Sequence, residues 1–355
     1  MRIIYGLLFC LLFMTGCTEQ SDPSSENSSD VTTPSNEQQV IASQLQTPWA
    51  IELVGETIYL TERPGNIVEV LEDGELTRKP VEFIDDLAGE PESGLLGIAF
   101  PDDFSSSNRA YIYYSYHTNN NGNFQRITTI SEQEDTWVEE EVLLDGIPGG
   151  TYHHGGRIKF GPDNLLYITV GDASQPELAQ NLDSLAGKVL RMNPDGSIPD
   201  NNPFENSYVY SYGHRNPQGL AWNEKGELYA TEHGNSALDE INLIEPGNNY
   251  GWPIIEGDET MDDMVSPMIH SGEDTWAPSG MEYANGALYF ATLRGESVKR
   301  FNPADSEVET ILENKGRIRD VKYGNNGLYI ITNNTDGRGN PSDNDDQLLW
   351  IPLEE

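Results

Sequence analysis

One hairpin pattern recurs six times along the chain, and it constrains the fold more than any other feature of the sequence. An alternating apolar strand leads into a turn of Gly, Asn and Asp, and a second strand follows that carries Leu-Tyr or a close variant. The first strands of the six copies cover residues 50–53, 96–100, 156–160, 219–222, 279–283 and 319–323. Period-two alternation on either side of such turns is typical of β-hairpins.

The spacing of the hairpins predicts a β-propeller. Further strand-like segments follow several of them, at residues 67–70, 188–192 and 297–301. Each unit of roughly 40–60 residues therefore supplies about four strands, as a propeller blade does. We expect an all-β, six-bladed β-propeller that forms a single domain over residues 40–355, closed by a strand at 347–351 beside the first unit. A pair of β-sandwiches is the alternative, but it does not explain the repeat.

The N-terminal segment has the features of an export signal. Its apolar run from Ile3 to Met14 is too short to span a bilayer. The ending Met-Thr-Gly-Cys resembles a bacterial lipoprotein signal, in which the Cys, here Cys17, becomes the lipidated first residue. An ordinary cleaved signal with an incidental Cys is the alternative.

The segment after Cys17 is polar and almost free of apolar residues up to residue 39. Such a composition is typical of a disordered tether. We therefore expect a signal peptide over residues 1–16 and a lipidated tether over 17–39. The protein would be exported and held on the periplasmic or extracellular face of the bacterial cell envelope, with the N-terminal lipid as its only contact with the membrane.

The charge of the chain is strongly acidic, with a formal net charge of −39. Such an excess of negative charge argues against a nucleic-acid partner, because nucleic acids bind to basic surface patches. A solvated acidic surface is one explanation. Carboxylates that hold divalent cations are another, and the two are compatible.

Several polar residues occupy the same place in the repeat, just before the first strand of a hairpin. Equivalent positions of a propeller lie on one face, around the central channel, so these side chains should converge. The residues concerned are Glu92, His153, His154, Arg215, Asn216, Arg317 and Arg319. Histidine exchanges protons near neutral pH. Several arginines at one point of an acidic protein favour an anionic ligand held by bidentate contacts, although an isolated arginine more often makes a surface ion pair of little consequence.

The motifs around these positions resemble those of the soluble glucose and aldose-sugar dehydrogenases that depend on pyrroloquinoline quinone (PQQ), which are six-bladed propellers. The resemblance covers residues 45–351. It rests on Gly-Leu-Leu-Gly-Ile-Ala-Phe at 94–100, on the runs 153–172 and 187–199, and above all on Gly-His-Arg-Asn-Pro-Gln-Gly at 213–219 followed by Tyr-Gly-Trp-Pro at 250–253.

This resemblance implies the oxidation of an aldose at its anomeric carbon to a lactone, with PQQ and Ca²⁺ as cofactors and an external electron acceptor. His153 is similar to the general base of the family, and Arg215 to the arginine that contacts the reactive carbonyl of the quinone. Cofactor contacts are implied for Glu92, Arg215, Asn216, Arg294, Arg317 and Arg319. Metal contacts are implied for the backbone oxygens of Gly234 and Asn235 at the cofactor's calcium, and for Glu240 and the Tyr250 carbonyl at a structural calcium.

Four residues depart from the glucose-oxidising pattern. Glu92 stands where that pattern has Gln, Tyr152 where it has Asp, Asn235 where it has Pro, and Arg294 where it has Lys. Glu92 places a carboxylate beside an anionic cofactor, which weakens binding unless calcium or an arginine neutralises it. The short loops after Tyr250 indicate an open pocket, as in the aldose-sugar group, that admits larger saccharides.

Two other functional classes stay open. Six-bladed propellers also serve as Ca²⁺-dependent lactonases, whose metal lies centrally on side-chain carboxylates and amides. An arginine-rich centre disfavours that chemistry. The other class is a non-catalytic surface lipoprotein that binds glycans or protein partners, since a fold does not fix a function.

Overall fold

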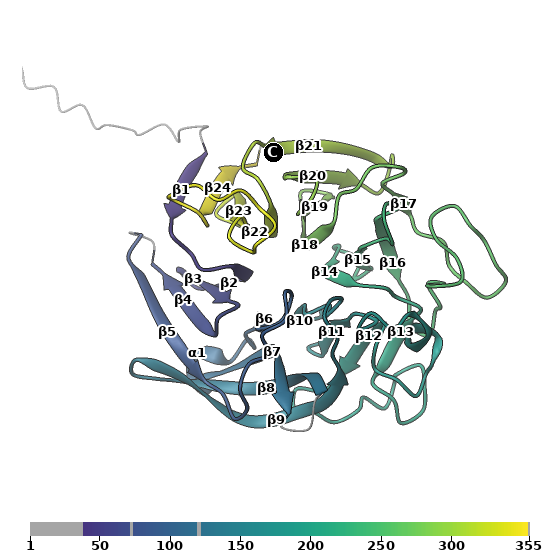
Figure 1. Ribbon diagram of the computed structural model, residues 1–355, viewed down its shortest axis with the longest axis horizontal. Coiled ribbons are helices and arrows are strands. Elements are labelled where there is room, and N and C mark those ends of the chain that lie inside the picture. Colours follow the sequence, from purple (N-terminus) through teal and green to yellow (C-terminus); the bar gives the residue numbers. More distant parts are fainter. Residues whose placement is uncertain (1–37, 72–73, 119–121, 354–355) are drawn as a thin grey trace, which may run out of the picture. The chain divides into compact units, whose positions relative to one another are not determined.

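Six four-stranded β-sheets are arranged as blades around a central channel (Figure 1). The computed structural model describes residues 38–71, 74–118 and 122–353. The predicted signal peptide and Cys17 lie outside the described residues, as does nearly all of the predicted tether. Within the described part of the chain, no helix is long and apolar enough to cross a membrane.

Each of the six sequence repeats becomes the first two strands of a blade. The first blade contains β2 (Pro48–Val54), β3 (Thr57–Glu62), β4 (Asn66–Val70) and β5 (Leu76–Glu82). The second contains β6 (Leu95–Ala99), β7 (Arg109–Thr118), β8 (Gly122–Gln133) and β9 (Thr136–Pro148). Strands β5 and β9 pair in parallel at the rim and join these two blades into one eight-stranded sheet.

The third and fourth blades follow the same order from channel to rim. The third contains β10 (Ile158–Phe160), β11 (Leu166–Val170), β12 (Lys188–Met192) and β13 (Val209–Tyr212). The fourth contains β14 (Pro217–Trp222), β15 (Leu228–Glu232), β16 (Glu240–Ile244) and β17 (Ile269–His270). Two short helices, α1 (Phe104–Ser107) and η1 (Pro176–Gln180), are the helical elements of the described residues.

The fifth blade contains β18 (Pro278–Ala284), β19 (Ala287–Thr292), β20 (Ser297–Asn302) and β21 (Glu307–Glu313). The sixth contains β22 (Ile318–Gly324), β23 (Gly327–Thr332), β24 (Leu348–Pro352) and, at the rim, the N-terminal strand β1 (Gln39–Ala42). The six-bladed prediction is confirmed.

The strand that we expected to close the ring does so, through a partner strand that the sequence did not reveal. Strand β24, which we expected beside the first unit, lies inside the sixth blade between β23 and β1. Its partner is the N-terminal strand, with Gln39 opposite Trp350 and Val40 opposite Leu349. Leu348 of β24 also packs in one cluster with Ile58 and Leu60 of the first blade, as expected for a strand beside the first unit. The prediction missed the partner strand, because the four residues of β1 are too few to show a pattern. Strands from both ends of the described chain thus share one blade, which closes the ring.

Apolar side chains from neighbouring blades pack together and form the core. In the largest cluster Tyr59 of the first blade lies 4.6 Å from Phe100 after β6, measured between ring centroids. Trp137 of the second blade is fully buried and stacks on Phe104. The alternation that predicts the hairpins therefore also sends side chains to both faces of each blade, toward both neighbours.

The innermost strands β2, β6, β10, β14, β18 and β22 surround the channel (Figure 1). Halfway along it, Arg157 Nη1 lies 2.7 Å from Asp320 Oδ2, and the two side chains are only 3% and 4% exposed. Gly280 leaves room for this pair, because a Cβ there would lie 1.6 Å from Asp320 Oδ1. Toward the C-terminal ends of the strands, each blade adds one side chain to a ring, namely Glu52, Phe100, Lys159, Trp222, Glu282 and Lys322. This ring of side chains occupies one mouth of the channel, so a binding site would have to lie at the opposite mouth.

Candidate active site

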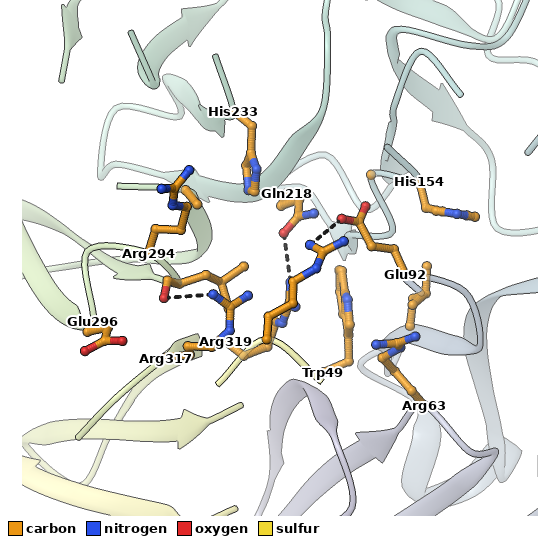
Figure 2. A pocket seen from close by; sticks show the side chains of 15 residues that line it. Trp49, Arg63, Glu92, His154, Gln218, His233, Arg294, Glu296, Arg317 and Arg319 are labelled. Atoms are coloured by element: carbon orange, nitrogen blue, oxygen red, sulfur yellow. Dashed lines mark hydrogen bonds and ion pairs between the residues drawn. The ribbon is translucent and has the colours of Figure 1, made fainter. Parts of the chain in front are cut away.

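Two cavities open where the innermost strands begin. The larger has a volume of about 520 Å³ and is lined by Arg63, Arg294, Arg317, Arg319 and Arg338 among others (Figure 2). The second, of about 260 Å³, contains His153, Arg215, Asn216, Gly234 and Asn235 in its lining. Glu92, His233, Ala277, Arg294 and Arg338 line both, so the cavities adjoin. The structure thus brings the residues that the repeat predicts to converge together at one mouth of the channel.

Two of the five arginines are neutralised by carboxylates. Arg317 Nη2 lies 2.8 Å from Asp336 Oδ2, and Arg338 Nη1 lies 2.9 Å from Glu92 Oε1. In this protein, then, an arginine balances the carboxylate of Glu92.

The other three arginines have no ion-pair partner among the described residues. Arg63 donates to the Ser93 carbonyl, and Arg319 donates to the neutral oxygens of Asn333 and Gln218. Burial lowers the pKa of Arg319 to about 9, and this guanidinium is only 6% exposed. Buried cations that lack a carboxylate are costly unless a ligand neutralises them. The larger cavity is therefore suited to an anion.

His153 lies beside this cavity in the arrangement of a general base. Its Nδ1 is 2.7 Å from Asp172 Oδ1, and the ring is 19% exposed while the carboxylate is fully buried. Asp172 also accepts the Ser174 N–H at 2.7 Å and the Trp252 indole N–H at 2.9 Å. A carboxylate held in this way keeps the proton on Nδ1, which leaves Nε2 free to accept one from a substrate.

Glycines allow the loop that carries His153 to pack closely on β11. A Cβ on Gly171 would lie 2.0 Å from the His153 carbonyl oxygen. Gly155 has a φ of +65°, and its N–H donates to Asn216 Oδ1 at 2.9 Å. The oxygen of Asn216 therefore helps to hold this loop, beside the cavity that its side chain lines.

Arg215 lies between the cavity and the loop of Gly234 and Asn235. Its guanidinium is 5.4 Å from the Trp252 ring centroid, and it approaches the Asn235 carbonyl at 3.5 Å. Its Nε is buried and has no hydrogen-bond partner within the described structure, and burial lowers the pKa of Arg215. This arginine therefore has a donor that the described part of the protein does not use.

Glu240 and Tyr250 do not line the two main cavities. They border a separate space of about 10 Å³ together with Glu232, Glu256 and Arg215. Burial and the neighbouring charge of Glu232 raise the pKa of Glu240 to about 8. Among the described residues, no group of three or more His, Cys, Asp and Glu side chains is arranged to hold a metal ion. A cation at this place would thus depend on carbonyl oxygens such as that of Tyr250, which calcium accepts.

Two histidines border the larger cavity. His154 is 2% exposed, contacts Ser115 through Nδ1 at 3.1 Å, and leaves Nε2 without a partner in the described structure. His233 also has an unpartnered, buried Nε2 and points toward the cavity centre in Figure 2. Burial lowers the pKa of His154 and of His233 to about 4. Both rings are therefore neutral near pH 7.

Comparison with known proteins identifies the family. A family model described as "Glucose / Sorbosone dehydrogenase" matches residues 45–348. The chain belongs to this family. The dehydrogenase family assignment confirms the resemblance that the motifs indicate.

Several of its relatives are named as sugar dehydrogenases. The chain is 29% identical to aldose sugar dehydrogenase YliI of Escherichia coli over 337 residues, 84% of this chain and 90% of that protein. It is 38% identical to quinoprotein glucose dehydrogenase B of Acinetobacter calcoaceticus over 258 residues, 62% of this chain and 53% of that protein. The PQQ-bound aldose sugar dehydrogenase of Streptomyces coelicolor is 36% identical, with a TM-score of 0.83, and the match covers 91% of this chain and 100% of that one. These relatives support sugar oxidation as the general function.

Sequence reasoning missed several residues of this candidate site. Asp172 lies in the Gly-Asp pair that directly follows β11, and a search for a carboxylate to orient His153 would have found it. Arg63 follows β3 at the same end of the first blade, where the repeat gives a weak signal. Arg338 lies in the long connection between β23 and β24 and carries no motif, so only the folded chain shows its position.

Proposed function

We propose that the protein is a PQQ-dependent aldose dehydrogenase that oxidises the anomeric carbon of a sugar to a lactone. One observation carries the proposal: the His153–Asp172 pair lies beside a cavity of about 520 Å³ that contains unpaired arginines. PQQ bears three carboxylates, and the exposed Arg294 and the buried Arg319, which have no ion-pair partner among the described residues, would supply charges that fit them. Arg317, whose charge Asp336 already balances, would add hydrogen-bond donors. The unpartnered Nε of Arg215 and Nε2 of His233 supply further polar atoms at the cavity walls.

The protein's own groups would divide the work as follows. His153 Nε2 accepts the proton of the anomeric hydroxyl, and Asp172 stabilises the resulting imidazolium. When bound, PQQ would supply the acceptor for the hydride that leaves the anomeric carbon, so that the sugar would lose two electrons and become the lactone. Arg215 would donate to the reactive carbonyl of the cofactor and stabilise the charge that develops there. The electrons then pass to an external acceptor.

Calcium is the second cofactor of the proposal. The carbonyl oxygens of Gly234 and Asn235 would hold one ion near Arg215 and the cofactor, and Glu240 with the Tyr250 carbonyl would hold another that is structural. The crowding of Glu232 and Glu240 around one small space supports the second site, because a divalent cation would relieve the repulsion between the two carboxylates.

Dye reduction tests the enzyme proposal. The wild type is reconstituted with PQQ and Ca²⁺ and assayed with glucose, maltose and xylose. The His153→Ala variant should lose about 10²–10⁴-fold in turnover, as expected for a general base, and should still bind PQQ. Arg215→Ala should lose both turnover and cofactor affinity. A wild type that neither binds PQQ nor reduces dye with any aldose removes the enzyme proposal and leaves a binding lipoprotein.

Export and lipid attachment at Cys17 are part of the same proposal, with residues 1–16 as the signal, 17–39 as the tether and 40–355 as the propeller. The apolar run before Cys17 and the polar segment after it support this division. Mass spectrometry of the N-terminal peptide from cell-associated protein should show a lipidated Cys17. An unmodified Cys17 in that fraction would contradict it.

A further inference from the structure

His153 has a main-chain conformation that needs support. Its φ is +63°, in the left-handed region that residues with a Cβ rarely adopt. Such conformations persist where surrounding contacts hold them, and they occur often at functional sites. The main-chain N–H of His153 donates to Glu92 Oε2 at 2.9 Å, and its carbonyl accepts the Ala173 N–H at 3.3 Å. The contact with Glu92 crosses from the third blade to the connection between β5 and β6.

Glu92 is itself held in place. Arg63 Nε donates to the carbonyl of Ser93 at 2.8 Å, and Gly94 packs against the Arg63 backbone, where a Cβ would lie 2.3 Å from the carbonyl oxygen. The second oxygen of Glu92 lies 2.9 Å from Arg338 Nη1. Burial alone would raise the pKa of Glu92, but the His153 N–H and Arg338 outweigh it and lower the pKa to about 2. The carboxylate is therefore anionic, and each of its oxygens has a donor.

Arg338 comes from the connection between β23 and β24, which is also anchored. Asp336 Oδ1 accepts the Arg338 N–H at 2.8 Å, and the other oxygen of Asp336 binds Arg317. The Arg338 guanidinium lies 5.3 Å from the centroid of the Tyr152 ring, next to His153 in the sequence. The side chain of Arg338 is 45% exposed, so its ion pair with Glu92 contributes less than a buried one.

We infer that Glu92 and Arg338 are positioning residues for His153: the carboxylate fixes the main chain of the base, and the arginine holds the carboxylate. The inference rests on the proposed function, in which His153 is the base. It differs from the role that the family resemblance implies for Glu92, namely contact with the cofactor. One oxygen of Glu92 already accepts from a main-chain donor and the other from an arginine, so the protein's own groups hold this carboxylate in place without a cofactor.

Four variants and one control test the inference. Glu92→Leu removes the acceptor of the His153 N–H, whereas Glu92→Gln keeps an oxygen there and removes the charge. Arg338→Leu breaks the ion pair and Arg338→Lys keeps a cation. Glu309→Leu is the control, because Glu309 makes an exposed ion pair with Arg300 on the fifth blade, outside both cavities.

We expect Glu92→Leu to lower kcat by about tenfold or more, the effect of losing one hydrogen bond to a charged group. KM for maltose and the Kd for PQQ should change less than kcat does, because the lost hydrogen bond holds the main chain of His153, although Glu92 itself lines both cavities. Arg338→Leu should lower kcat by about two- to fivefold, as an exposed ion pair does. Glu92→Gln and Arg338→Lys should restore most of the activity.

Hydrogen exchange at the His153 amide, measured without sugar or PQQ, gives a readout that does not depend on the reaction. It should speed up in Glu92→Leu and stay at the wild-type rate in Glu309→Leu. Unchanged exchange in Glu92→Leu would overturn the inference, and so would a weakened Kd for PQQ with unchanged kcat, which would make Glu92 a cofactor contact. A wild type without dehydrogenase activity would remove the proposed function, while the exchange measurement would still decide whether Glu92 holds His153.

Discussion

The buried ion pair in the channel offers the sharpest test of what holds the ring together. Asp320 Oδ2 accepts from Arg157 Nη1 at 2.7 Å and from the Ile51 N–H at 2.9 Å. Arg157 also donates to the Gln218 carbonyl and lies 4.3 Å from the Trp49 ring centroid. One carboxylate thereby links the sixth, third and first blades directly, and the fourth through Arg157.

The perturbation is Asp320→Ala. It leaves the Arg157 guanidinium, 3% exposed, without an anionic partner, and removing one partner of a buried pair typically costs about 3–5 kcal/mol. The Ile51 N–H also loses its acceptor, at about 1–3 kcal/mol. Because these two costs overlap, we expect the free energy of unfolding to fall by about 4 kcal/mol, a large share of the roughly 5–15 kcal/mol of a typical domain.

Urea denaturation, followed by tryptophan fluorescence at fixed Ca²⁺, measures this loss. Glu309→Ala is the matched control, because the Arg300–Glu309 pair is 30% and 56% exposed and should contribute less than about 1 kcal/mol. The double variant Arg157→Met with Asp320→Asn should be more stable than Asp320→Ala, since no unpaired charge remains. If Asp320→Ala and Glu309→Ala unfold at the same urea concentration with equal slopes, the reasoning is refuted.

Three further predictions concern the site. Asp172→Asn should lower kcat by about 10²–10⁴-fold with little change in PQQ affinity. The reason is that one amide oxygen cannot fix the His153 tautomer and also accept from the other donors. Steady-state kinetics with a PQQ titration check this. Burial lowers the pKa of His154 to about 4, whereas a histidine in the unfolded chain titrates near pH 6.5. The fold therefore keeps its full stability above pH 6.5 and loses about 3 kcal/mol of unfolding free energy as the pH falls from 6.5 to 4. His154→Gln should flatten this part of the stability profile. If Glu240 and the Tyr250 carbonyl hold calcium, chelation should lower Tm and added Ca²⁺ should restore it, and equal melting curves for metal-loaded and chelated protein would contradict the site.

The fold could be predicted almost completely, because each hairpin carries its own signal. The turn residues and the period-two alternation are local, so the six copies in 50–323 can be counted without knowing any contact. The closure could not be predicted in this way. Strand β1 consists of Gln39–Ala42, and its pairing with β24 joins residues more than 300 positions apart. No local pattern encodes such a register.

The residues of the candidate site can likewise be predicted where they follow the repeat and not where they lie outside it. His153, Arg215, Arg317 and Arg319 follow from their equivalent places in the repeat, and the structure brings them to one mouth of the channel. The position of Arg338 could not be predicted from the repeat, because its contact with Glu92 spans 246 positions and arises from a connection outside the repeat. The roles of the predicted residues in binding and catalysis stay predictions until the variants are measured.

The geometry explains how one ring supplies both a stable fold and a chemically specialised mouth. At the far end, ion pairs join Lys322 to Glu52 and Glu282, and Lys159 to Glu282, so positive and negative side chains balance one another around the channel. At the near end the balance is broken, since Arg319 and two other arginines lack carboxylates among the described residues. In a chain of net charge −39 such a local excess of cations is a costly exception. The balanced end and the buried Arg157–Asp320 pair stabilise the ring, so that the cations at the other end remain available to bind an anion.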